Sequence, residues 1–198
     1  MHEEDTGELG TIRSFAERWA AGTLRQADRV TEARRRALAI DRDYERMEDW
    51  SPTLAEVHQA FDDAWVEQHL LVVAAHQFDK WARRLIEVGS SVRAPLVPGS
   101  LATLRNSLEH LDEALFQRDL AVPDSTSTKK TWSLAALPGG GLSLGSDWRE
   151  ATLTAFGILD VDAILNECQA VMSDIFEERV APHVDWYIQS LIDQRRGK

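Results

Sequence analysis

Two long stretches without a proline most constrain the fold of this chain. They cover residues 11–49 and 53–88, and apolar residues recur in both at three- and four-residue steps. This spacing places the apolar side chains on one side of an α-helix. The first stretch predicts one long helix, or two joined near residues 21–23, where Gly22 is the only break signal. The second predicts another long helix, with Ser51 as its cap. Because this helix is apolar around much of its circumference, we expect it to be central in a bundle.

A leucine seam predicts a third helix over residues 100–120. Its leucines follow one another at three- and four-residue steps: Leu101, Leu104, Leu108, Leu111 and Leu115. One stripe of this helix must therefore face a core.

The composition changes beyond the third helix. Apolar and small polar residues roughly alternate on either side of the glycines at 139–141, which predicts a β-hairpin over residues 131–145 and a further strand at 151–157. The glycine run lacks the Gly-Lys-Ser/Thr ending of a phosphate-binding loop, so we interpret it as a turn. Asp160 is placed to cap a last long helix, and Pro182 to interrupt it before a short final helix.

These elements predict a mostly α fold: an up-and-down bundle of about five helices, with a small β-hairpin or meander between the third and fourth long helices. The hydrophobic content of 43% and the charged content of 28% are those of a globular protein. We expect an acidic, disordered tail at residues 1–10 and a single domain at 11–198. Residues 121–157 would form the loop and hairpin insertion.

The net charge of −11 weighs against broad binding to nucleic acid. The only dense basic run, Arg34-Arg35-Arg36, lies among acidic residues, which predicts a solvated face of mixed charge. The single cysteine, Cys168, excludes an internal disulfide and lies in an apolar stripe typical of an inert buried thiol. Seven tryptophans are many for a chain of this length, and we expect most of them to be core anchors or interface residues.

The N-terminal residues are acidic and lack the apolar run of a signal peptide, and no window is long and apolar enough to span a bilayer. We therefore expect a cytoplasmic protein with no membrane association.

Three histidines of the second helix, His58, His69 and His76, fall on nearly one line along it. They differ in height by roughly 16 and 10 Å, so no two can bind the same ion without ligands from other helices. DinB-like bundles bind a metal through histidines on different helices, but the paired histidine spacing that marks them is missing here. A DinB-like metal-dependent hydrolase is therefore only the third hypothesis.

Carboxylates of the third helix suggest a second metal hypothesis, since Glu109, Asp112 and Glu113 lie near His110. A di-metal bundle needs a Glu-x-x-His motif on each of two helices, and the chain has none. The acids are better explained as solvent-facing or as partners of Arg105, which has the i, i+4 spacing for an ion pair with Glu109. We expect no metal and no cofactor.

The segment Arg105-Asn106-Ser107-Leu108-Glu109-His110 resembles the motif of the HEPN family, an arginine often followed by asparagine and then a histidine after four to six residues. This resemblance implies a helical bundle, usually dimeric, with the motif on a core helix. Active members are metal-independent ribonucleases with paired motifs at the dimer interface, in settings that include toxin–antitoxin and defence systems. By this resemblance His110 would assist proton transfer at the ribose 2′-hydroxyl, Arg105 would stabilise charge on the phosphate, and Asn106 would orient the imidazole.

The leading hypothesis is thus a homodimeric HEPN-like protein that cleaves or binds RNA. The competing hypothesis is a non-catalytic bundle that acts through a protein partner or a small ligand. In that case Arg105 would pair with Glu109 or Asp112, and His110 would bond within its own chain.

Overall fold

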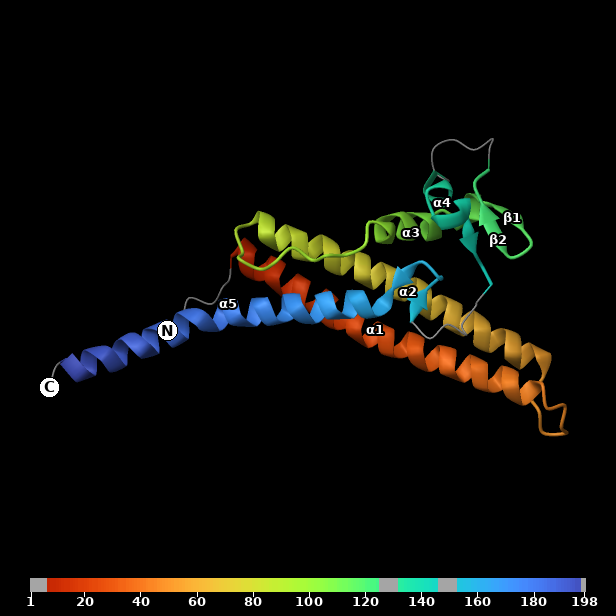
Figure 1. Cartoon of the computed structure of the whole chain (residues 1–198), viewed down its shortest axis with the longest axis horizontal. Helices are drawn as coiled ribbons and strands as arrows, with labels where there is room; N and C mark the ends of the chain where they lie inside the picture. The colour runs from red at the N-terminus through yellow and green to blue at the C-terminus, as the bar shows by residue number, and fades with distance from the viewer. Residues whose placement is uncertain (1–6, 125–131, 146–152, 197–198) are drawn as a thin grey trace.

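A helical hairpin forms the body of the molecule. The computed structural model describes residues 7–124, 132–145 and 153–196. Helices α1 (Glu8–Tyr44) and α2 (Leu54–Glu87) lie side by side over most of their lengths (Figure 1). α1 is a single helix, which decides between the two alternatives for this stretch. It begins at Glu8, so residues 8–10 are helical, and their assignment to a disordered tail was wrong.

The start of α2 also differs from the prediction. Thr53, not Ser51, caps the helix: its hydroxyl accepts a hydrogen bond from the amide of Glu56, whose carboxylate accepts one from the amide of Thr53. This reciprocal pair satisfies two amides that a helix start leaves open. Ser51 instead donates to the carbonyl of Asp43 at 2.7 Å and so fastens the loop between the two helices.

Small residues on α1 allow α2 to pack closely against it. Ala16, Ala20 and Ala27 are buried on α1, and they belong to the same core as Leu71 and Phe78 of α2. Because α2 also contacts α3, α5 and β4, it is the central helix, as its broad apolar surface predicts (Figure 1).

The third helix is shorter than the leucine seam predicts. α3 (Ser100–Glu109) is followed by His110 as its C-terminal cap and then by a 3₁₀ turn, η1 (Leu111–Glu113). Leu115, the last leucine of the seam, lies instead on strand β1 (Leu115–Gln117) and is 45% exposed. The predicted helix to residue 120 was therefore wrong, because pairing between strands overrides the local helical pattern.

The strands form two small sheets. β1 pairs antiparallel with β2 (Leu120–Val122) across a tight turn at Arg118, whose φ is +57°, and β2 pairs with β3 (Leu142–Ser143). The predicted hairpin over 131–145 was wrong in detail. A short helix, α4 (Trp132–Ala135), and the 3₁₀ turn η2 (Pro138–Gly140) precede β3.

The second sheet leads into the last helix. β4 (Thr154–Ala155) pairs with β5 (Leu159–Asp160), and the remainder of the strand predicted at 151–157 lies partly outside the described residues. The carboxylate of Asp160 accepts a hydrogen bond from the amide of Ala163 at 3.1 Å, which confirms its role as a cap. α5 (Val161–Arg196) then continues through Pro182, so the predicted interruption does not occur.

Glu178 anchors α5 where it reaches the end of the hairpin. Its carboxylate accepts hydrogen bonds from the hydroxyl of Ser90 at 2.7 Å and the amide of Ser91 at 3.0 Å, and it pairs with Arg13 at 3.3 Å. Burial alone would raise the pKa of Glu178, but the bonds from the two serines and the charge of Arg13 together lower it. Beyond this anchor α5 extends away from the bundle (Figure 1).

None of the six tryptophans that the structure describes is a fully buried core anchor, and their alternative role at an interface stays a prediction. Trp50, Trp132 and Trp186 are 61%, 70% and 72% exposed. Trp19, Trp65 and Trp81 are only partly buried against the core. No helix within the described ranges is long and apolar enough to cross a membrane.

Candidate functional site

The outer surface of α3 carries the residues of the sequence motif. Leu101, Leu104 and Leu108 are buried, which fixes the orientation of the helix and leaves Arg105 and Glu109 at its half-exposed edge. The leucine seam thus positions the motif, although it is shorter than expected.

Side chains of the motif hold Arg105 in place. The guanidinium donates to the side-chain oxygen of Asn106 at 3.0 Å and forms an ion pair with Glu109, one turn further along α3. This is the i, i+4 pair that the spacing predicts. The side-chain oxygen of Asn106 is thereby directed to Arg105.

His110 lies at the C-terminal cap of α3, with its side chain 39% exposed. Its Nδ1 atom lies 3.6 Å from Oε1 of Glu113. The imidazole is accessible from solvent and has an acidic neighbour, so it can exchange a proton with a bound molecule.

Two histidines of α2 extend this site across the helix contact. Burial lowers the pKa of His76, and the positive charge of Arg105 lowers it further. Burial also lowers the pKa of His69, against the opposing charge of Glu109. Both imidazoles are therefore mostly neutral at pH 7, and Nδ1 of His76 has no hydrogen-bond partner within the described residues.

The third histidine of the row lies elsewhere. His58 is exposed near the start of α2, as the differences in height along the helix require. Within the described ranges, no three histidine, cysteine or carboxylate side chains are arranged to hold a metal ion. The site brought together on α2 and α3 therefore consists of imidazoles, an arginine and carboxylates.

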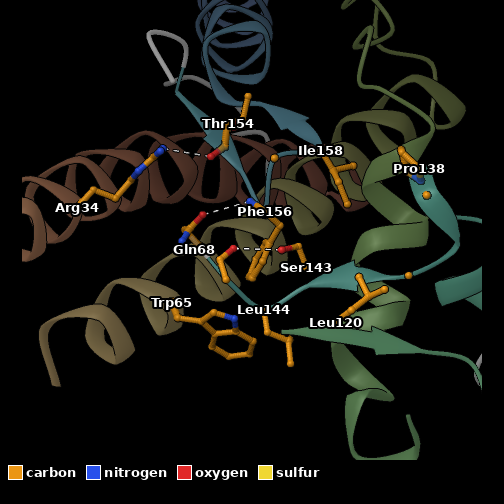
Figure 2. A pocket seen from close by; sticks show the side chains of 14 residues that line it. Arg34, Trp65, Gln68, Leu120, Pro138, Ser143, Leu144, Thr154, Phe156 and Ile158 are labelled. Carbon is orange, nitrogen blue, oxygen red and sulfur yellow. Dashed lines mark hydrogen bonds between the residues drawn. The ribbon is translucent and has the colours of Figure 1, made fainter. Parts of the chain in front are cut away.

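A cavity of about 290 Å³ lies away from the motif, between α1, α2 and the loops around β3 and β4 (Figure 2). Arg34 enters it from α1 and donates to the carbonyl of Thr154 at 3.2 Å. Gln68 enters from α2, and its carbonyl accepts a hydrogen bond from the amide of Phe156 at 3.1 Å. The ring of Phe156 meets Trp65 edge to face at 5.6 Å. These bonds fasten the β4–β5 turn to the helical hairpin.

The prediction that Arg34, Arg35 and Arg36 all belong to a solvated face was wrong for Arg34. It is only 6% exposed, whereas Arg35 and Arg36 are exposed, so one of the three arginines does not belong to the solvated face. The sequence does contain the signal for this, because Arg34 falls on the helical stripe that includes Val30 and Ala37, both fully buried.

Comparison of the chain with models of known protein families, with curated proteins and with solved structures gave no match. The resemblance to the HEPN family therefore depends on the motif in α3 alone.

Proposed function

We propose that the face formed by α2 and α3 acts on RNA, as a metal-independent ribonuclease of the HEPN type. The observation that supports this proposal is that Arg105 of α3 lies close enough to His76 of α2 for its charge to act on the imidazole, while a half-exposed His110 follows at the end of α3. Cleavage of RNA without a metal needs a group to accept a proton, a group to return one, and a cation beside the phosphate.

Each step of the reaction has a candidate group. An imidazole removes the proton of the ribose 2′-hydroxyl, and the oxygen attacks the adjacent phosphorus. The bond from phosphorus to the 5′-oxygen breaks, and a second imidazole returns a proton to that oxygen, which leaves a 2′,3′-cyclic phosphate and a 5′-hydroxyl. His76, kept mostly neutral, suits the first role, and His110 beside Glu113 suits the second.

Arg105 is the group that would stabilise the phosphate. Its guanidinium has five N–H donors, so it can bind an oxygen anion when Glu109 turns aside. The acidic surroundings and the net charge of −11 oppose RNA binding, so we expect weak affinity that falls further with added salt.

The experiment compares wild type with His110→Ala on a single-stranded RNA in the presence of EDTA. General acid–base catalysis contributes roughly 10²- to 10⁴-fold, so the variant should lose activity on that scale. His58→Ala, an exposed histidine of α2 outside the site, is the matched control and should cleave like wild type. Equal activity of wild type and folded His110→Ala, or no activity in either, would remove the proposal.

A second candidate is a non-catalytic bundle that acts through protein contacts. The far half of α5 favours it, because this helix exposes large apolar side chains beyond the bundle: Val184, Trp186, Tyr187, Ile188, Leu191 and Ile192. Large exposed apolar patches mark interaction sites in folded proteins.

A further inference from the structure

The last four turns of α5 extend beyond the bundle, and their apolar side chains are exposed. Ile175 is the final buried residue of the helix, and the side chains at 181–189 and 191–195 are all exposed. An isolated helix of this length is only marginally stable in water, so a packing partner would stabilise this segment.

The exposed half has the pattern of a coiled-coil seam. One face carries residues at alternating four- and three-residue steps: Glu177, Ala181, Val184, Ile188, Leu191 and Arg195. Its four inner positions are apolar, and its two ends carry opposite charges. At 1.5 Å per residue this seam is about 28 Å long. Trp186 lies on the opposite side of the helix.

We propose that this seam, defined by the six residues above, binds the same seam of a second copy in the antiparallel direction. In one register Ile188 packs against Val184 of the other copy and Leu191 against Ala181, which is the alternation that antiparallel coiled coils use. The same register places Arg195 opposite Glu177 of the other copy. Because the pair is two-fold symmetric, each of these contacts occurs twice. The dimer then has four apolar layers, with one ion pair at each end.

The charges along the seam and on the whole chain favour a second copy in the antiparallel direction over a parallel pair or a membrane surface. A parallel pair would place Arg195 beside Arg195 and Glu177 beside Glu177, which repel. An anionic membrane surface would meet a chain of net charge −11. Glu177 is exposed, and its carboxylate accepts a hydrogen bond from the hydroxyl of Ser173 at 3.3 Å, which leaves further acceptor sites for Arg195.

This dimer is independent of the proposed ribonuclease site. α3 lies over the middle of the hairpin, far from the end of α5 (Figure 1). The α2–α3 face would therefore stay open in each copy.

Sedimentation equilibrium of the full chain across the micromolar range tests the proposal. Wild type should show a concentration-dependent mass that approaches twice the 22.3 kDa of one chain. Ile188→Asp should weaken dimerisation about 30-fold or more, because it places a charge in the central layer. Trp186→Asp, off the seam on the same helix, is the matched control and should dimerise like wild type.

Charge exchange tests the direction of pairing. Glu177→Arg and Arg195→Glu should each weaken the dimer, and the double variant should restore it, because opposite charges then face each other again. A parallel dimer would gain nothing from the double variant. A monomeric wild type at every concentration, a double variant no better than the single ones, or binding of the seam to anionic vesicles in place of self-association would overturn the proposal. Far-ultraviolet circular dichroism confirms that each variant is folded.

Discussion

Arg105 of α3 lies close enough to His76 of α2 for its charge to reinforce the effect of burial and lower the pKa of the imidazole further. This relationship joins a residue of the sequence motif to one that no motif marks. It also gives the site a neutral imidazole beside a permanent cation, the combination from which the proposed reaction follows.

Removing Arg105 should raise the pKa of His76. In Arg105→Ala the repulsion from the guanidinium is lost, while burial still keeps the pKa below its ordinary value of 6.5. A titration of the imidazole proton by nuclear magnetic resonance measures the change. Arg84→Ala removes an exposed arginine of α2 whose partners are Glu8 and Glu87, and it should leave the pKa of His76 unchanged. An unchanged or lower pKa in Arg105→Ala would show that the two side chains do not interact.

Stability should depend on pH through His69 and His76. Their pKa values are lower in the folded chain than the 6.5 of an unfolded one, so the unfolded state binds more protons as the pH falls. The free energy of unfolding is therefore highest above pH 6.5. It decreases as the pH falls below 6.5 and through the lower pKa values that the two histidines have in the folded chain. Urea unfolding at about pH 7.5 and pH 5 measures it. The double variant His69→Gln/His76→Gln should show a smaller loss, and an equal loss would assign the effect to other groups.

Phe78→Ala should destabilise the fold by about 3–5 kcal/mol. Phe78 is fully buried in α2 at the core shared with α1, so its removal leaves a cavity. Phe176→Ala removes the same ring from α5, where it is 59% exposed, and should cost far less. Urea unfolding of the two variants compares the free energies. Similar losses would contradict the placement of the core.

Cys168 should not react with thiol reagents in the folded protein. Burial raises the pKa of its thiol to about 12, so almost no thiolate forms at pH 8, and the side chain is inaccessible. Alkylation should therefore follow unfolding and become fast in urea. Equal rates for native and unfolded protein would show that the packing of α5 against α1 does not bury this residue.

The helical hairpin could be predicted from the sequence because its signals are local and long. The spacing of apolar residues over 11–49 and 53–88 extends through many turns, and Asp160 has the chemistry of a cap at the start of α5. The sequence predicts Ser51 as the cap of α2, but threonine is a good cap residue too, and Thr53 takes this position. The reciprocal bond with Glu56 decides for Thr53.

The strands could not be placed in the same way because their pairing is non-local. Leu115 continues a helical seam in sequence, yet it lies in β1, where its partner is Val122, and β3 comes from a segment some twenty residues further on. The residues of the candidate site could likewise be predicted only in part, because some of its contacts are non-local. Arg105 and His110 belong to one motif, but His76 comes near Arg105 only through the packing of α3 on α2.

The proposed activity is tested most directly by the chemical ends of the RNA fragments that the wild-type protein releases in EDTA. Attack by the 2′-hydroxyl leaves a 2′,3′-cyclic phosphate on one fragment and a 5′-hydroxyl on the other, and these are the ends we predict. Their yield should fall in Arg105→Ala and His110→Ala. Fragments with 5′-phosphate ends, or intact RNA after prolonged incubation, would contradict a ribonuclease site on the α2–α3 face.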